Sequence, residues 1–297
     1  MREQRKRTHN EYRQKMSFLS ISMNFCEKAK VIPFTFVRYS FIMVLNCEER
    51  GGFVGELLAV LSGKGGTGKT SVCAGIATAL ASSGVDVLCI DCDIGLRNLD
   101  ISLGMSQISA LSFTDVSQGG YSLEQAAVHP DYPKLQFLTA PMNCAAESID
   151  KEAFREMLAK ARKRYQYVFL DAPAGIDAGF QLAAQFADRV LLVTGSDPAA
   201  VRDATRAGEV LELMGKNEVR LIVNRINPKM VSAMALTIDD IMDRAGLPLM
   251  GIVPEDPNVT LSAAFYKPLL KHTKKGAAAA CKRIAKRIQG MNVSVTL

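Results

Sequence analysis

The sequence predicts a single α/β domain whose mostly parallel sheet is covered by helices on both faces. Three observations predict it: apolar strand-like runs alternate with helical stretches from residue 56 onward, a glycine-rich loop joins the first run to the first helix, and two runs end in an aspartate. Alternation of this kind builds parallel sheets, which bind ligands beyond the carboxyl ends of their strands. A functional site is therefore expected at that edge.

The predicted elements follow one another with little interruption. The strand-like runs cover 57–61, 85–91, 135–139, 167–171, 189–194, 219–224 and 249–253. The helical stretches cover 69–83, 150–163, 177–187, 199–214, 232–245, 258–265 and 275–289. We therefore expect one domain over residues 56–290, followed by a short C-terminal tail at 291–297.

Residues 1–55 differ in composition from this domain. We expect an N-terminal extension that is either disordered or the result of a start site assigned too early, with Met43 as a later start. The apolar run 31–45 is interrupted by Pro33 and Arg38, is too short for a spanning helix, and has no obvious small-residue cleavage site after it. Export is therefore disfavoured.

Charge is distributed unevenly along the chain. The net charge is +6, but residues 1–46 carry nine Lys or Arg against three Asp or Glu, and residues 267–297 carry eight against none. The body between these ends is therefore acidic, at about −8. Nucleic-acid binding needs clustered positive charge, so it is not expected of the body, and any polyanion or membrane contact should lie at the ends.

Cysteine and histidine usage argues against disulfide and metal chemistry. The seven cysteines are scattered, which favours a reducing compartment and predicts a cytoplasmic location. Cys89 and Cys92 form a C-x-x-C pair in an apolar run, where buried packing is favoured over redox or zinc chemistry. The three histidines lie far apart in sequence, so no metal-binding or histidine-based catalytic cluster is visible.

Residues 63–70 match the phosphate-binding loop pattern G-x-x-x-x-G-K-[ST]. The expected nucleotide-binding residues are Gly63, Lys64, Gly65, Gly66, Thr67, Gly68, Lys69, Thr70 and the following Ser71. Backbone N–H groups of such a loop converge on phosphate oxygens, Lys69 adds charge at the β- and γ-phosphates, and Thr70 offers a hydroxyl to Mg²⁺. We therefore expect a P-loop NTPase that uses ATP and Mg²⁺.

Two aspartates end strand-like runs where a nucleotide enzyme of this class needs acidic groups. Asp91 ends the run 85–91, and Asp171 ends the run 167–171 before a Pro/Gly turn. Carboxylates on adjacent strand ends can hold the waters of a Mg²⁺ ion or orient a water toward the γ-phosphate. The alternative is that both merely cap loops or helices.

Several further segments resemble the MinD family of septum-site ATPases, in the group that includes ParA, Mrp and the nitrogenase iron protein. The resembling segments are Gly63–Thr70, Asp91–Asp100, Asp171–Ile176, Asn224-Arg225, Pro228–Met230 and Gly251–Asp256. The similarity runs from about residue 56 to about 290. Within it, the I-G-L-R-N-L-D stretch at 94–100 is the most specific, and Lys64, directly after the first glycine, marks the dimerising members with a deviant Walker A loop.

This resemblance implies an ATPase that forms a dimer around two ATP molecules and turns over slowly, stimulated by dimerisation and a partner. Lys64 and Asp93 are the implied catalytic residues: Lys64 reaches the partner's nucleotide, and Asp93 lies near the attacking water. Thr70, Asp91 and Asp171 are implied at the metal, and Asn224 near the adenine. A cation supplied across the interface would stabilise charge that develops on the phosphates.

The family's role is to bind the inner face of the membrane when ATP-bound, recruit the division inhibitor MinC, and leave when a MinE-like partner stimulates hydrolysis. This implies a cytoplasmic protein with a peripheral membrane state. The C-terminal helix departs from the family pattern, because its apolar stripe is thin: Cys281, Ile284, Ala285 and Ile288. We expect it to pack on the body, with a weak contact of its basic face with anionic membrane as the alternative.

Two other functions stay open at this point. One is a ParA-like DNA-partitioning or flagellar-number ATPase, which the acidic body and the stretch at 94–100 disfavour. The other is a nucleotide-regulated scaffold with negligible turnover, which only a turnover assay separates from an enzyme.

Overall fold

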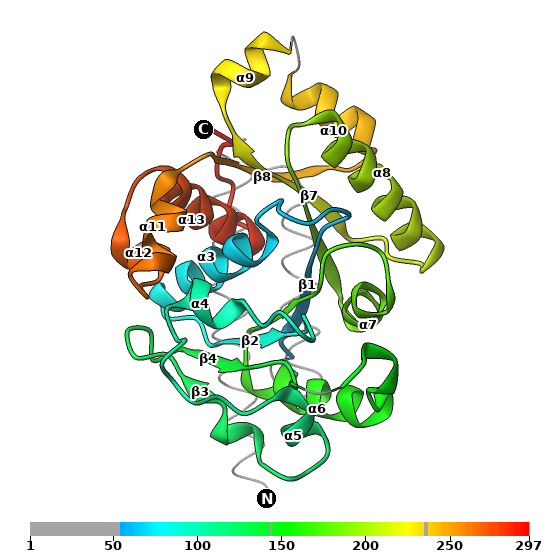
Figure 1. Ribbon diagram of the computed structural model, residues 1–297, viewed down its shortest axis with the longest axis vertical. Helices are drawn as coiled ribbons and strands as arrows, with labels where there is room; N and C mark the ends of the chain where they lie inside the picture. The colour runs from blue at the N-terminus through cyan, green and yellow to red at the C-terminus, as the bar shows by residue number, and fades with distance from the viewer. Residues whose placement is uncertain (1–53, 143, 235–236, 297) are drawn as a thin grey trace, which may run out of the picture. The chain divides into compact units, whose positions relative to one another are not determined.

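Eight strands form one sheet in the order β3-β4-β2-β5-β1-β6-β7-β8 (Figure 1). The computed structural model describes residues 54–142, 144–234 and 237–296. The strands are β1 (Glu56–Leu61), β2 (Val87–Asp91), β3 (Ala127–Val128), β4 (Leu135–Leu138), β5 (Tyr167–Asp171), β6 (Arg189–Thr194), β7 (Val219–Ile226) and β8 (Leu249–Pro254). Every neighbouring pair is parallel except β3 with β4.

Helices cover both faces of this sheet. They are α3 (Lys69–Ser82), α4 (Leu99–Leu103), α5 (Phe113–Ser117), α6 (Lys151–Arg164), α7 (Ala178–Phe186), α8 (Pro198–Leu213), α9 (Pro228–Ala233), α10 (Ile238–Ala245), α11 (Pro257–Ala264), α12 (Leu269–His272) and α13 (Gly276–Ile288), with 3-10 turns at Leu123–Gln125 and Ala146–Ser148. One apolar cluster joins the sheet to α3 and α13, and a second joins its other face to α6, α7 and α8. The predicted fold class is confirmed.

The central strands read as continuous apolar runs because both of their faces are buried. All five residues of β2 are buried, as are the last five of β1. A parallel sheet covered on both sides requires this pattern, whereas a sheet open to water on one side would alternate. The seven predicted strands are therefore all present, and each lies within two residues of its predicted bounds.

One predicted helix is wrong. The stretch 232–245 contains the end of α9 and a separate helix, α10, which starts after Thr237. The Thr237 hydroxyl accepts from the Asp240 N–H, and the Asp240 carboxylate accepts from the Thr237 N–H, so a capping box begins a new helix here. The sequence interpretation also missed α4, α5, α12 and β3, which are too short to show a periodic pattern.

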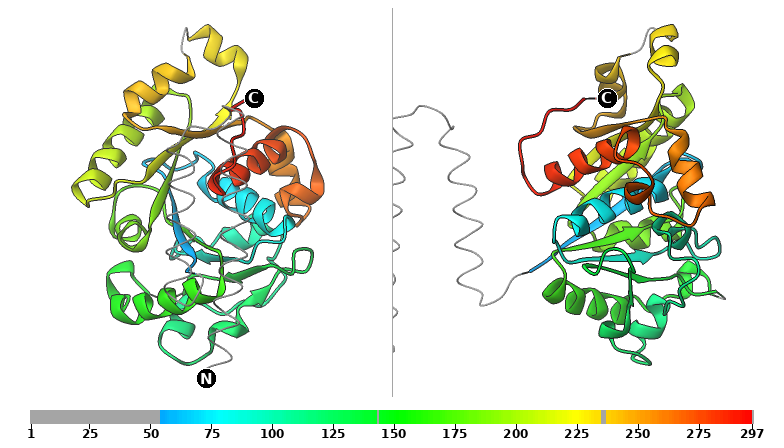
Figure 2. Two further views of the ribbon diagram at one scale, coloured as in Figure 1. Left: turned by 180° about the vertical axis from the view of Figure 1, so that it is seen from behind. Right: turned by 90° about the vertical axis from the view of Figure 1, so that its left-hand side faces the viewer.

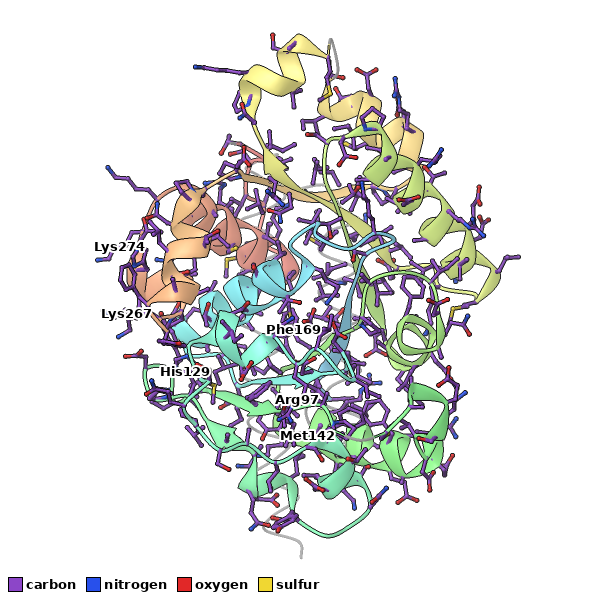
Figure 3. All side chains as sticks on the ribbon, in the orientation of Figure 1. Arg97, His129, Met142, Phe169, Lys267 and Lys274 are labelled. Atoms are coloured by element: carbon purple, nitrogen blue, oxygen red, sulfur yellow. The ribbon has the colours of Figure 1, made fainter. Side chains whose placement is uncertain are left out.

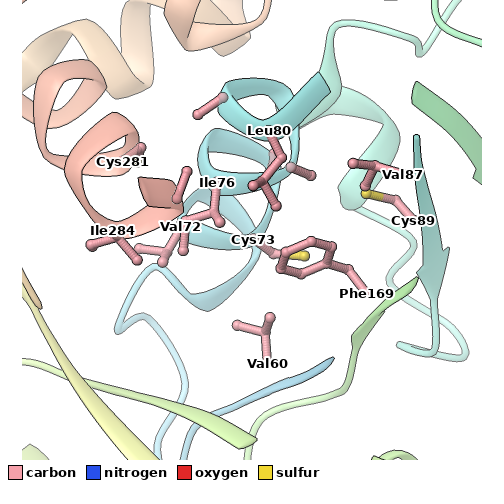
Figure 4. Close-up of a cluster of buried hydrophobic side chains, with 14 of the residues drawn as sticks. Val60, Val72, Cys73, Ile76, Leu80, Val87, Cys89, Phe169, Cys281 and Ile284 are labelled. Carbon is pink, nitrogen blue, oxygen red and sulfur yellow. The ribbon is translucent and has the colours of Figure 1, made fainter. Parts of the chain in front are cut away.

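The C-terminal helix α13 packs on the body, as expected. Figure 2 shows α13 beside α3, and Figure 4 shows Cys281 and Ile284 of α13 facing Val72 and Ile76 of α3. The approach is close, because a Cβ at Gly75 of α3 would lie 2.6 Å from the Cys281 sulfur. The predicted apolar stripe of α13 is thus part of the core, with Ile284 only 1% exposed.

The C-x-x-C cysteines are buried free thiols, which confirms the packing interpretation. Cys89 belongs to the apolar cluster on the α3 face of the sheet, and Cys92 to the cluster on the opposite face. Their side chains are therefore separated by the sheet.

Among the described residues, no group of three or more His, Cys, Asp or Glu is placed to hold a metal ion, and no helix is long and apolar enough to cross a membrane. Residues 1–53 of the extension predicted at 1–55 lie outside the described residues.

His129 is held neutral in the fold, which predicts a pH effect on stability. Its Nδ1 accepts from the N–H groups of Asp131 and Tyr132, at 3.0 and 3.3 Å, and its Nε2 contacts the Leu103 carbonyl oxygen at 2.8 Å. Burial lowers the pKa of His129. The pKa of His129 is therefore lower in the folded chain than in the unfolded chain, where it is about 6.5. As the pH falls through that value the unfolded chain binds a proton first, and the folded state loses stability.

We expect the thermal midpoint to fall more steeply between pH 7.5 and 5.5 in the parent protein than in His129→Gln, although the variant is less stable at pH 7.5. Thermal unfolding followed by circular dichroism measures both slopes, and the other groups that titrate cancel in the comparison. Parallel slopes for the parent and His129→Gln would contradict the neutral, buried histidine.

Candidate functional site

The glycine loop lies at the carboxyl edge of the sheet, between the end of β1 and the start of α3. Gly66 and Gly68 have φ of 78° and 82°, the left-handed region that favours glycine. Gly68 also allows a close approach: a Cβ there would collide with the Asn224 amide nitrogen. The loop pattern predicted from sequence is therefore formed, and glycine is needed at positions 66 and 68.

Lys69 is buried at the first turn of α3 and faces the end of β5. Its ammonium lies 2.7 Å from Asp171 Oδ1 and 3.2 Å from the Thr70 hydroxyl oxygen. Lys69 and Asp171 are 6% and 1% exposed, so the pair is almost fully removed from water. An unpaired buried charge is costly, and each of these groups compensates the other. The three residues assigned to the phosphates and the metal thus meet at one point.

The two strand-end carboxylates are direct neighbours. β2 and β5 pair in parallel with Asp91 opposite Asp171, as predicted from the positions of both at strand ends. Asp91 accepts from the backbone N–H of Asp93 at 2.9 Å and of Leu99 at 3.2 Å. Burial, and then the charge of Asp171, raise the pKa of Asp91 to about 7. Burial also raises the pKa of Asp171, although Lys69 opposes that shift.

These residues fit a Mg²⁺ site. The donors are carboxylate and hydroxyl oxygens, which Mg²⁺ prefers. Asp171 Oδ2 is buried and has no hydrogen-bond partner within the described part of the chain. Two adjacent carboxylates with raised pKa values would both be stabilised in the charged form by a nearby divalent cation. Thr70, Asp91 and Asp171 are therefore suited to the metal role predicted for them.

Asp93 lies just beyond the end of β2 and is half-buried. Burial raises its pKa, while the Lys69 charge opposes the shift, so Asp93 belongs to the same electrostatic environment as the buried pair. Its backbone N–H holds Asp91. The proposed role of its carboxylate at the attacking water stays a prediction.

Lys64 has a partner that the sequence interpretation missed. Its ammonium lies 3.4 Å from Asp197 Oδ1, with the two side chains 43% and 55% exposed. Asp197 also caps α8 by accepting from the Ala200 N–H at 3.0 Å. Burial raises the pKa of Asp197, but the Ala200 N–H and the Lys64 charge outweigh burial and hold the pKa below its usual value. An exposed pair of this kind is weak, so Lys64 can leave Asp197 at little cost.

A cavity of about 570 Å³ lies beside the loop and is large enough for a nucleotide base and sugar. Ser71 and Asn224, both assigned to the nucleotide, line it. Asn224 is buried and donates to the Thr67 carbonyl at 2.7 Å, so it also braces the loop. The sequence interpretation missed the other wall, which β8 and α11 supply through residues 253–257, Val259 and Thr260.

Arg225 follows Asn224 and was assigned no role from sequence. Its φ is 56°, which is rare for a residue other than glycine. Its guanidinium donates to the Gly66 carbonyl at 3.1 Å and lies 3.8 Å from Glu255. Another cavity, of about 490 Å³, is lined by Lys64, Gly65, Gly66 and Arg225 among others. The sequence signals for Arg225 were its place in the resembling segment Asn224-Arg225 and its position near the end of an apolar run.

Known proteins are similar to the chain over nearly the same residues. It matches the family described as CobQ/CobB/MinD/ParA nucleotide binding domain over residues 58–269. The septum site-determining protein MinD of Synechocystis is 35% identical over 241 residues, which are 80% of this chain and 91% of that protein.

Solved structures agree with this similarity. The MinC:MinD cell division complex of Aquifex aeolicus contains a chain 35% identical, with a TM-score of 0.75, over 82% of this chain and 99% of that one. MinD of Pyrococcus horikoshii, complexed with Mg-ADP, is 26% identical, with a TM-score of 0.69, over 79% of this chain and 96% of that one. With the loop, the strand-end aspartates and this extent of identity together, the chain belongs to the MinD family of nucleotide-binding proteins.

Proposed function

We propose that the chain is a MinD-type ATPase that binds MgATP, dimerises and hydrolyses ATP slowly, and thereby places the division site by recruiting a MinC-like inhibitor to the membrane. The observation that carries the proposal is the buried contact of Lys69 with Asp171 at the end of a formed glycine loop, with Asp91 in register beside it. The Mg-ADP complex of the Pyrococcus relative and the MinC:MinD complex of the Aquifex relative support it.

Binding follows from groups already in position. The loop amides and Lys69 hold the phosphates, and Ser71 and Asn224 lie along the 570 Å³ cavity for the sugar and base. Lys69 would reach the phosphates from its place beside Asp171 and Thr70, and Thr70, Asp91 and Asp171 would hold the metal. When bound, Mg²⁺ supplies positive charge that neutralises the phosphates and keeps Asp91 and Asp171 ionised.

Hydrolysis requires a second copy of the chain, because each copy supplies Lys64 to the phosphates of the other. Lys64 pairs with Asp197 at the surface of the same chain. We propose that it exchanges this weak pair for the nucleotide of a second copy, which makes turnover depend on dimerisation. Asp93 orients the attacking water. Slow turnover by the isolated chain and stimulation by a partner follow from this division of the site.

Sizing with MgATP and with MgADP, combined with a phosphate-release assay, tests the proposal. We expect a dimer only with MgATP and slow release of phosphate. An ATP-dependent dimer without release would favour the nucleotide-regulated scaffold. Double-stranded DNA is the third arm: ATP-dependent co-sedimentation that weakens with salt would favour a ParA-like function instead.

A further inference from the structure

The membrane contact of a MinD-type protein needs an exposed apolar surface, and α13 does not offer one. Its apolar face is in the core, with Cys281 and Ile284 each 1% exposed. Two of its arginines are also occupied: Arg283 donates to the Thr296 carbonyl at 2.6 Å, and Arg287 to the Val293 carbonyl at 3.0 Å. Deleting residues 271–297 would therefore unfold the domain before it tested membrane binding.

The preceding helices, α11 and α12, expose an apolar group next to positive charge. Leu261, Phe265 and Tyr266 are 44%, 59% and 56% exposed. The surrounding exposed lysines are Lys267, Lys271, Lys274 and Lys275. We call these seven residues the α11–α12 patch. Figure 3 shows Lys267 and Lys274 at the same edge of the molecule, projecting outward.

Packing holds the patch together as one surface. The Phe265 ring stacks on His272 with their centroids 5.9 Å apart, which joins the end of α11 to the end of α12 between Lys271 and Lys274. Residues 257–297 contain no acidic side chain. Within the part of the chain that the structure describes, the one acidic partner of a lysine of the patch is Asp131, 3.0 Å from Lys271.

Tyr266 is exposed and has a backbone conformation that is unusual for a residue other than glycine. It has φ of 52°, the conformation that usually selects glycine after a helix. Its N–H donates to the Ala263 carbonyl and the Lys267 N–H to the Ser262 carbonyl, so α11 ends in a Schellman motif with tyrosine in the glycine position. A strained residue whose side chain lies in solvent contributes little to the fold, and such departures mark functional surfaces.

We propose that the α11–α12 patch is a membrane-contact site for anionic lipid. Leu261, Phe265 and Tyr266 enter the headgroup region, where aromatic side chains are favoured, while the lysines pair with lipid phosphates. The lysines alone fit any polyanion, but exposed Leu and Phe add nothing on a duplex phosphate backbone and gain free energy in a bilayer. The inference rests on the proposed function and moves its membrane contact from α13 to α11 and α12.

The same helices form a wall of the nucleotide cavity. Val259, Thr260 and Leu269 line the 570 Å³ cavity from the inner side, whereas Leu261 and Phe265 face solvent. One patch is a weak anchor, and an ATP dimer carries two, so the second contact forms at a high effective concentration. Stable membrane binding would thus follow the dimer.

A single tryptophan reports insertion directly, because the chain contains none. In Phe265→Trp, mixed phosphatidylcholine and phosphatidylglycerol vesicles should shift the emission to the blue, and phosphatidylcholine alone should not. Leu213→Trp is the matched control, since Leu213 is 88% exposed on α8, and its emission should stay unchanged. Unshifted emission from Phe265→Trp, while the protein co-sediments with the anionic vesicles, would overturn the proposal.

Binding by the unlabelled full chain is the second measurement. Phe265→Ser with Tyr266→Gly should lose at least about tenfold in vesicle affinity. Its thermal stability should stay close to that of the parent protein, because glycine suits the cap of α11 and offsets the lost stacking of Phe265 on His272. Lys267→Glu with Lys274→Glu should also lose binding, and Lys160→Glu with Lys163→Glu on α6 should retain it. Equal losses in both charge-reversal pairs, or vesicle binding abolished by competing duplex DNA, would reject a lipid site here.

Running both measurements with and without MgATP, at high protein concentration, separates this inference from the proposed function. Vesicle binding that depends on Phe265 and Tyr266 but not on MgATP would support the patch and contradict the ATP-controlled dimer. Vesicle binding that depends on MgATP but not on Phe265 and Tyr266 would do the reverse.

Discussion

Replacing Lys69 with alanine is expected to lower the affinity for MgATP by at least about a hundredfold, since charge-assisted contacts to phosphate are among the strongest in proteins. Lys69 is buried, already deprived of water and 2.7 Å from its counter-ion, so its charge is available to the phosphates without a new desolvation cost. The remaining loop amides cannot supply a net charge. Titration with a fluorescent ATP analogue, with and without Mg²⁺, measures the loss.

The variant must remain folded for this result to count. Removing Lys69 leaves Asp171 in the core without its partner, which costs about 3–5 kcal/mol if the carboxylate stays charged. Burial already raises the pKa of Asp171, so protonation limits that cost. Lys160→Ala, on the exposed face of α6, is the matched control and should bind as the parent does.

Lys69→Arg keeps the charge but not its shape, and it should bind weakly too, because a guanidinium cannot occupy the point between Asp171 and Thr70. Circular dichroism at the assay temperature confirms folding of each variant. Parental MgATP affinity in a folded Lys69→Ala would remove the nucleotide site from this loop.

Lys64→Ala and Asp93→Ala are expected to separate dimer formation from hydrolysis. Lys64 lies in the loop and pairs with the exposed Asp197, apart from the buried pair of Lys69 and Asp171. Lys64→Ala should therefore bind ATP normally and fail to dimerise, because the second copy's phosphates lose a cation. Asp93→Ala should keep the ATP dimer and lose about a hundredfold or more in rate, as expected when a positioned catalytic group is removed. Sizing with MgATP and a phosphate-release assay read the two effects independently.

Asp197→Ala is the control for Lys64, since it frees the lysine without removing it. Because the exposed pair is weak, this variant should still dimerise with MgATP, although it loses the α8 cap and with it about 1 kcal/mol of stability. The trans role of Lys64 is wrong for this chain if Lys64→Ala forms the parental ATP dimer. The role of Asp93 is wrong if its alanine variant hydrolyses ATP at the parental rate.

Much of the nucleotide site was predictable because its residues are close together in sequence or end adjacent strands. The loop from Gly63 to Thr70 needs only local geometry: a strand, left-handed glycines and a helix start. Asp91 and Asp171 are eighty residues apart, yet both end apolar runs, and parallel strands bring such ends to one edge. The contacts of Lys64 with Asp197 and of Arg225 with Gly66 were not predictable. The first joins two loops and the second joins the glycine loop to β7, and only the packed sheet sets the spacing in each case.

The sequence by itself determined the fold class, the seven longer strands and the phosphate loop, because the spacing of apolar residues and the positions of glycines are local properties of the chain. Only the tertiary structure decided what the apolar stripe of the C-terminal helix α13 contacts. Ala285 and Ile288 form the same thin stripe whether α13 lies on a membrane or on α3, and close packing at Gly75 assigns that stripe to the core. It also decided that Phe265 and Tyr266 face water, because exposure depends on which neighbouring elements cover a helix and not on the period of its residues.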